Sequence, residues 1–125
     1  MPYQLHWEPN GVYWKYYGIV IGKEIINATT IIYGDPRFDN LKYKLLDFLD
    51  AENIKIDDLE IAKIAYQHRA AQLSNPNVKN ALVVKPESTA LANKFSDLLS
   101  GSRWEVQVFH DLEAANTWVD RKPTP

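Results

Sequence analysis

The side chains that could do chemistry are few in this chain and lie far apart in the sequence. Cysteine is absent, which excludes disulfides and thiolate metal sites. The three histidines show no metal-ligand spacing: His6, His68 and His110. The carboxylate pairs Asp47 with Asp50 and Asp57 with Asp58 lack a partner that would complete an acid–base pair. We therefore predict no catalytic residue, no metal and no cofactor, and we expect the chain not to be an enzyme.

The remaining candidates have positions that favour structural roles over catalysis. His68 lies in the middle of a helix-like segment with no nucleophile or ligand three or four residues away, so a surface or packing role is favoured. Lys85 and Ser88 follow a strand-like run and precede a helix-like run, where open α/β sheets collect ligands and a helix N-terminus can hold an anion. Ser88 also suits a helix cap, and no glycine-rich loop accompanies it.

Composition and charge limit the classes of partner. The 125 residues carry a formal net charge of -2, with acids and bases interleaved. Lys42 and Lys44 form only a short basic cluster, whose charge nearby acidic residues balance. We therefore expect no nucleic-acid partner. The first residues lack the features of a secretory signal, and no apolar run approaches the roughly 18–20 residues of a membrane span. We expect a cytoplasmic protein, with peripheral membrane attachment as an open alternative.

Apolar runs rich in β-branched and aromatic residues alternate with amphipathic helical runs. The first kind predicts five strands: Tyr3 to Trp7, Val12 to Val20, Leu41 to Leu49, Asn80 to Val84 and Trp104 to Phe109. The second kind predicts four helices: Gly22 to Tyr33, Asp57 or Asp58 to about Leu73, Pro86 to Leu99, and one capped by Asp111 that ends at about Val119.

This order of elements predicts one α/β domain with a mixed, mostly parallel five-stranded sheet. The first two strands form an antiparallel hairpin through the turn at Asn10-Gly11, and the helices pack on the sheet through right-handed crossovers. In the third strand Tyr43 and Leu45 share one face with Asp47, and Leu46 and Phe48 share the other. We place the domain at residues 1–119 and a flexible C-terminal tail at residues 120–125.

The element order and the last strand–helix pair resemble the SpoIIAA-like branch of the STAS superfamily. The resemblance covers almost the whole chain and rests on Leu45-Leu-Asp-Phe-Leu-Asp50, on Ile54-Lys-Ile-Asp-Asp-Leu-Glu-Ile61, and on Trp104-Glu-Val-Gln-Val-Phe followed by Asp111-Leu-Glu-Ala-Ala-Asn-Thr-Trp118. It implies a STAS-type fold in a bacterial protein, without a catalytic signature. Proteins of this branch are also similar to the CRAL-TRIO lipid-exchange domain, which implies an apolar ligand or a membrane surface as a partner.

The first turn of the second predicted helix departs from the family. STAS anti-anti-sigma factors open this helix with an Asp-Ser-Ser-Gly type motif, whose serine is phosphorylated by a partner kinase. Here Asp57 matches the family aspartate, and Asp58 or Leu59 replaces the serine. The resemblance thus implies a partner surface without the phosphorylation switch. Capping and the helix macrodipole explain the two carboxylates, and we favour that explanation over mimicry of phosphoserine.

Two of the predicted helices carry more apolar residues than one sheet can cover. These residues spread over more than one helix face, so they cannot all contact the sheet. We predict that they line a hydrophobic cavity or groove beside it, with these ligand-binding residues: Ile25, Ile26, Ile32, Tyr33, Ile61, Ile64 and Ala65. A larger core or a homodimer interface would cover the same side chains, and both alternatives stay open.

The sequence therefore favours a non-catalytic binding module of the SpoIIAA-like type. Its expected ligand is an apolar small molecule or a lipid surface. One alternative is a regulatory module that binds a protein partner, with Asp57, Asp58, Lys85 and Ser88 as candidate contacts. A small-molecule enzyme is the least favoured alternative.

Overall fold

The computed structural model describes residues 3–122, which contain five strands and four α-helices. The strands are β1 (Tyr3–Trp7), β2 (Gly11–Ile21), β3 (Tyr43–Lys55), β4 (Lys79–Val83) and β5 (Glu105–Phe109). The helices are α1 (Gly22–Tyr33), α2 (Asp58–Ala71), α3 (Thr89–Leu98) and α4 (Leu112–Val119). Two short 3-10 helices are also present, η1 (Pro36–Asn40) and η2 (Pro86–Ser88).

The five strands form one sheet in the order β1-β2-β3-β4-β5. β1 pairs with β2 in the antiparallel direction, and each of the other pairs is parallel. At the hairpin turn the backbone N–H of Glu8 donates to the carbonyl of Gly11 at 2.8 Å. These pairings confirm the predicted fold class, a mixed and mostly parallel sheet that begins with an antiparallel hairpin.

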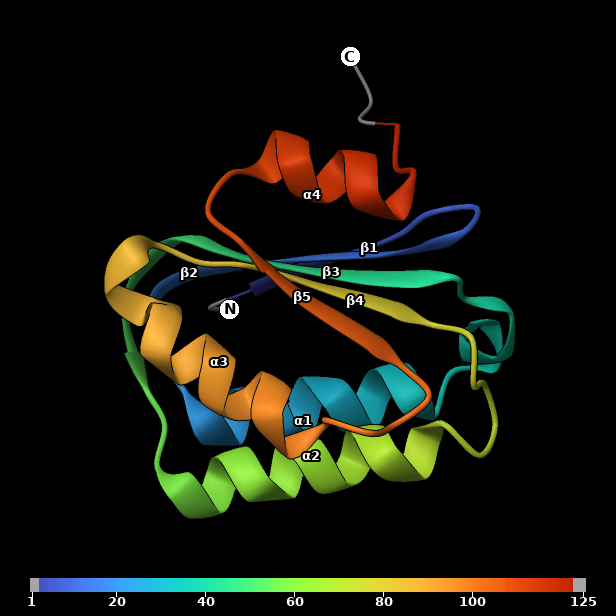
Figure 1. Cartoon of the computed structure of the whole chain (residues 1–125), viewed down its shortest axis with the longest axis horizontal. Coiled ribbons are helices and arrows are strands. Elements are labelled where there is room, and N and C mark those ends of the chain that lie inside the picture. Colours follow the sequence, from blue (N-terminus) through green and yellow to red (C-terminus); the bar gives the residue numbers. More distant parts are fainter. Residues whose placement is uncertain (1–2, 123–125) are drawn as a thin grey trace.

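Helices cover both faces of the sheet. α1, α2 and α3 lie on one face, and α4 lies on the other (Figure 1). β3 is buried from both sides: Leu46 and Phe48 belong to the larger core, and Tyr43 and Leu45 belong to the core under α4. Successive side chains of a strand point to opposite faces, and this alternation separates the two cores as the sequence predicted.

Two helix starts follow directly from acidic caps. The Asp57 carboxylate accepts the backbone N–H of Glu60 at 2.8 Å, and the Glu60 carboxylate accepts the N–H of Asp57 at 3.0 Å, which forms a capping box at α2. The Asp111 carboxylate accepts the N–H of Ala114 at 2.8 Å at the start of α4. Both caps agree with the sequence prediction.

The structure differs from the predicted elements mainly at their ends. β3 continues past Leu49 to Lys55 because β2 pairs with it as far as Ile21. The helix predicted from Pro86 to Leu99 is divided into η2 and α3. Ser88 has φ −102° and ψ 7°, which are not α-helical values, so the α-helix begins only at Thr89.

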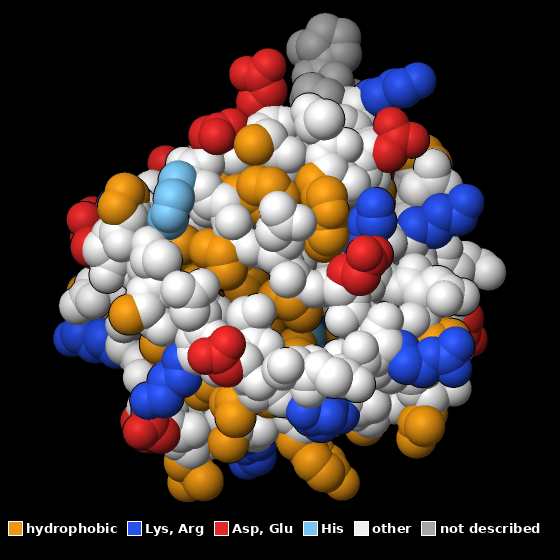
Figure 2. Space-filling view, viewed as in Figure 1, with side chains coloured by type: hydrophobic (Ala, Val, Ile, Leu, Met, Phe, Trp, Pro, Cys, Tyr) orange, Lys and Arg blue, Asp and Glu red, His pale blue; other side chains and the backbone are white. Residues whose placement is uncertain are grey.

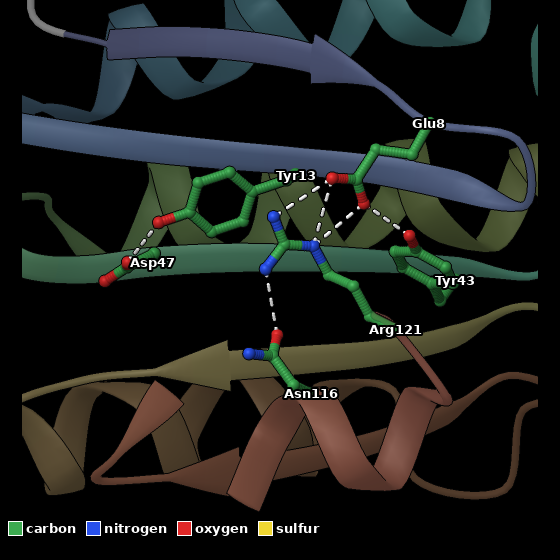
Figure 3. A network of polar contacts seen from close by, with 6 residues as sticks. All are labelled: Glu8, Tyr13, Tyr43, Asp47, Asn116 and Arg121. Atoms are coloured by element: carbon green, nitrogen blue, oxygen red, sulfur yellow. Dashed lines mark hydrogen bonds and ion pairs between the residues drawn. The ribbon is translucent and has the colours of Figure 1, made fainter. Parts of the chain in front are cut away.

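A polar network joins the hairpin to the C-terminal segment on the α4 side of the sheet (Figure 3). Arg121 donates from Nε to one oxygen of Glu8 at 2.8 Å and from Nη2 to the other at 3.0 Å. Its Nη1 donates to Asn116 Oδ1 at 3.0 Å, and its guanidinium lies 4.2 Å from the centre of the Tyr13 ring. The Tyr43 hydroxyl also donates to Glu8. The network thus ties together residues from opposite ends of the chain.

Two further contacts extend this network to the middle of β3. The Tyr13 hydroxyl donates to the buried Asp47 at 2.5 Å, and the other Asp47 oxygen accepts the N–H of Leu49 at 3.0 Å.

Arg121 belongs to the segment that was predicted to be a flexible tail. Its contacts show that the bound part of the chain extends past residue 119 as far as Arg121. Residues 123–125 of the predicted tail lie outside the described residues.

The network makes Glu8 a stabilising carboxylate. Burial alone would raise the pKa of Glu8, but hydrogen bonds from Arg121 and Tyr43 outweigh burial, so the pKa is lowered. A lowered pKa means that the contribution to stability is complete above the usual glutamate pKa. It disappears as the pH falls through the lowered value.

We expect Arg121→Met to lower the free energy of unfolding by about 1–3 kcal/mol, because it leaves a partly buried carboxylate without its charged donor. Urea denaturation followed by tryptophan fluorescence at pH 7 measures the loss. Lys15→Met is the matched control, because Lys15 pairs with the more exposed Asp50 at 2.9 Å and such pairs contribute at most about 1 kcal/mol. Equal losses in the two variants would contradict the importance given to the Arg121 network.

Candidate ligand-binding cavity

An apolar cavity of about 70 Å³ lies between the sheet and the three helices α1, α2 and α3. Its lining contains only three polar side chains, and they belong to Thr29, His68 and Ser88. The lining residues are Ile25, Thr29, Leu46, Phe48, Ile54, Ile56, Ile61, Ile64, His68, Leu82, Val84, Ser88, Leu91, Ala92 and Phe95. The cavity lies beside the sheet at the place that the apolar surplus of α1 and α2 predicted.

Each wall follows from the periodicity of its element. The sheet contributes alternate residues of β3, and α2 contributes Ile61, Ile64 and His68, which share one face at spacings of three and four. The α3 wall is the most open, because Leu91 and Phe95 are only half buried. Figure 2 shows hydrophobic side chains gathered in the middle of the visible face, in the region of β5 between α3 and α4.

The structure brings together only part of the predicted ligand-binding set. Ile25, Ile61 and Ile64 line the cavity. The other members lie elsewhere: Ile32 and Ala65 are buried in packing contacts, Ile26 is partly buried against the core, and Tyr33 packs against Phe38, His68 and Trp104. Helix periodicity identified apolar faces correctly, but it did not indicate which residues of a face lie over the hollow.

Sequence reasoning missed the third wall of the cavity. Leu91, Ala92 and Phe95 belong to the predicted helix from Pro86 to Leu99, but they were not predicted to line the cavity. Ile54 and Ile56 were also missed, because they follow the predicted end of the third strand. Only the position of α3 beside α2 indicates that these side chains share one space.

The four predicted partner-binding residues lie in two separate places. Asp57 caps α2, and Asp58 forms an ion pair with Lys94 of α3. Ser88 lines the apolar cavity and also an adjoining polar hollow that includes Lys85. Lys85 Nζ donates to the carbonyl of Ala51 at 2.9 Å. The structure therefore does not gather the four residues into one contact surface.

A fully buried lysine lies next to the cavity wall. Lys44 donates from Nζ to the Tyr33 hydroxyl, and its Nζ lies 2.9 Å from His68 Nε2. The same Nζ lies 4.8 Å from the ring centres of Tyr33 and Trp104. None of the ion pairs formed within residues 3–122 includes Lys44. Lys44 is therefore buried without a carboxylate partner among these residues.

The hydrogen bonds assign a neutral state to His68. His68 Nδ1 lies 2.9 Å from the carbonyl of Ile64, which can only accept, so Nδ1 carries the proton and Nε2 accepts from Lys44. Burial lowers the pKa of Lys44 well below its usual value. Burial, together with the proximity of Lys44, lowers the pKa of His68 as well. The prediction of a packing role for His68 agrees with its burial, although its contact with Lys44 was not foreseen.

We expect the stability of the wild-type protein to rise between pH 7.5 and 9.5, by up to about 1.4 kcal/mol per pH unit. The reason is that burial lowers the pKa of Lys44 in the folded state below its unfolded value, so its burial opposes folding less as the pH approaches the ordinary lysine pKa. Above this range the buried tyrosines, whose pKa values burial raises, would act in the opposite direction. Urea unfolding at a series of pH values measures the slope.

The variant Lys44→Met should show a flatter profile over the same pH range, because its side chain has no proton to bind. Lys63→Met, at an exposed position of α2, is the matched control and should keep the wild-type slope. A flat wild-type profile would contradict the lowered pKa of Lys44.

Within residues 3–122, no helix is long and apolar enough to cross a membrane. The same residues contain no group of three or more histidine, cysteine, aspartate or glutamate side chains that could hold a metal ion. No protein-family model matches the chain, and no curated protein matches it significantly.

Solved structures provide the informative comparison. SpoIIAA, an anti-sigma factor antagonist, in its unphosphorylated form is 14% identical, with 94% of this chain and 97% of that chain covered and a TM-score of 0.57. A protein of the DUF3478 family with a SpoIIAA-like fold, from Shewanella loihica PV-4, is 12% identical, with 94% and 91% covered and a TM-score of 0.54. The phosphorylated form of the Bacillus cell fate determinant SpoIIAA is 12% identical, with 93% and 98% covered and a TM-score of 0.52. The chain therefore has the SpoIIAA-like, STAS-type fold.

Proposed function

We propose that this protein is a non-catalytic binding module that holds an apolar ligand in the cavity between the sheet and helices α1, α2 and α3. The observation that carries the proposal is the cavity itself, whose lining is apolar except for three side chains. Apolar cavities bind small hydrophobic molecules, whereas a polar hollow of the same size would hold water.

The size of the cavity limits the ligand. An engineered apolar cavity of about 150 Å³ binds benzene, and the present cavity is about half as large, at 70 Å³. A ligand of a few carbon atoms therefore fits without movement. A longer chain requires α3 to move outward, and this helix is the least firmly held wall because Ala92 is its one buried residue.

We expect a small apolar alcohol such as 1-pentanol to bind saturably and to shift the methyl NMR signals of Ile25, Ile64 and Leu91. Ala92→Leu should abolish these shifts, because the added carbon atoms occupy the cavity. Ala90→Leu is the matched control, since Ala90 is exposed on the same helix and does not line the cavity. Unchanged methyl signals in the wild-type protein at millimolar alcohol would rule out the proposed function.

A second candidate function is the binding of a protein partner by the outer face of α2. The supporting observation is a stripe of exposed apolar side chains on α2 and just beyond its end, spaced by seven residues: Leu59 is 79% exposed, Tyr66 73% and Leu73 91%. Figure 2 shows hydrophobic side chains protruding along the lower rim, where Figure 1 places α2. A solved neighbour of this chain is an anti-sigma factor antagonist, which makes a protein partner a reasonable second candidate.

Such an interaction would not use the phosphorylation switch of the related anti-anti-sigma factors. The first turn of α2 is Asp58-Leu59-Glu60-Ile61, which contains no hydroxyl group. One of the similar structures is a phosphorylated form. We infer that any partner of this chain is released by other means.

A lipid surface would contact the same exposed stripe. Liposome flotation distinguishes binding to lipid from binding to a protein partner.

A photo-crosslinking amino acid placed at Tyr66 in cells should capture a discrete protein if this second function holds. The same amino acid at Gln107, which is exposed on β5, should not capture it. Mass spectrometry of the cross-linked product identifies the partner. Capture of the same protein from both positions, or from neither, would argue against an interface on α2.

A further inference from the structure

Lys44 is unusual for a buried lysine, because its immediate partners are neutral. Its Nζ contacts the Tyr33 hydroxyl and the unprotonated Nε2 of His68, and it forms no ion pair with the described residues. Buried lysines are normally paired with a carboxylate, since an unpaired charge in the interior is strongly unfavourable. This arrangement places a primary amine without a carboxylate partner inside the protein, where burial favours the neutral form.

Lys44 does not itself line the apolar cavity, but its Nζ contacts a residue that does. Lys44 precedes Leu46 and Phe48 on the same face of β3, and both of these residues line the cavity. Alternate residues of a strand are about 6.6 Å apart, so Lys44 is the next side chain along the cavity floor. Its hydrogen-bond partner His68 is itself a lining residue. The His68 ring is therefore the wall that separates the amine from the cavity.

We propose that Lys44 forms an imine with a small apolar aldehyde or ketone that occupies this cavity. This inference rests on the proposed function and deepens it, because it names the chemical class of the ligand. The carbonyl reaches Nζ past the edge of the His68 ring, which stays within hydrogen-bond reach of Nζ. The cavity selects the apolar part of the molecule, and Lys44 selects the carbonyl.

The two neighbours of Lys44 supply the proton transfers that the step requires. The Nζ lone pair attacks the carbonyl carbon, and a C–N bond forms while the C=O π bond breaks. One amine proton passes through His68 Nε2 to the oxygen, which gives a carbinolamine. Tyr33 then donates its proton to the departing hydroxyl group and regains a proton from nitrogen. The balance is amine plus carbonyl compound to imine plus water, without an oxidant or a reductant.

A buried acceptor without a partner lies beside the same strand position. Asn80 pairs in register with Lys44, and its Oδ1 has no hydrogen-bond donor among the described residues. Its side-chain nitrogen lies 3.5 Å from the carbonyl of Glu105, so that group is occupied. Buried polar atoms in native proteins are rarely left unpaired. Oδ1 is available to accept a hydrogen bond from the carbinolamine hydroxyl.

The test is reductive trapping with 3-methylbutanal and cyanoborohydride at pH 7.4, followed by peptide mapping of the wild-type protein. At this pH roughly one exposed lysine in a thousand is neutral, so exposed sites react slowly. We expect Lys44 to acquire the 3-methylbutyl group at least about tenfold faster than the exposed lysines. Tyr33→Phe should slow the labelling, whereas Ala90→Leu should leave it unchanged.

Two comparisons make the outcome decisive. Glyoxylate, a polar aldehyde, should not label Lys44 preferentially, and Ala92→Leu should protect Lys44 from 3-methylbutanal. Equal labelling by the two aldehydes, or labelling that persists in Ala92→Leu, would overturn the proposal because the amine would then react without the cavity. An unlabelled Lys44 in a protein that still binds 3-methylbutanol by NMR would overturn the imine alone. An unlabelled Lys44 together with no alcohol binding would overturn both the imine and the proposed function.

Discussion

The burial of β3 on both faces is the constraint on which the rest of the structure depends. Its neighbours β2 and β4 both run parallel to it, so each connection must cross over a face of the sheet. α1 and α2 provide these crossovers and lie together on one face (Figure 1). Each side chain of the first half of β3 therefore enters one of two cores, and a polar residue there must find its partners inside the protein.

The two buried polar residues of β3 meet this requirement in opposite ways. Asp47, on the α4 side, accepts from the Tyr13 hydroxyl and from the N–H of Leu49. Lys44, on the other side, has only a hydroxyl and an imidazole nitrogen as partners. Donors surround the carboxylate, whereas the amine is held by neutral groups and burial lowers its pKa. The sheet thus separates a polar network that joins the chain ends from an apolar region that contains a buried amine.

Local patterns in the sequence were sufficient for the fold but not for the site. The bounds predicted for the first helix, Gly22 to Tyr33, agree with α1, and the caps at Asp57 and Asp111 agree with α2 and α4. These features depend on residues within a few positions of one another, which periodicity and capping rules describe.

The environment of Lys44 depends on residues that are distant in the sequence. Its partners Tyr33 and His68 are separated from it by 11 and 24 positions and belong to different helices. One local signal was present, because Lys44 occupies the same face of the strand as Leu46 and Phe48, where a charge is out of place. No pattern in the sequence shows whether such a lysine finds a carboxylate. That depends on how α1 and α2 lie on the sheet.

The cavity and the buried lysine both reduce stability, and they lie together. A void of 70 Å³ costs roughly 2 kcal/mol by the relation found for core truncations. Natural proteins tolerate defects of this size, so neither feature alone indicates a function. A larger residue in place of Ala92 would fill the void. A methionine in place of Lys44 would avoid the free-energy cost of removing the lysine amine from water. The buried amine of Lys44 and an unfilled apolar space of molecular size both lower stability, and they adjoin each other. One ligand that compensates both costs explains this arrangement better than two independent defects do.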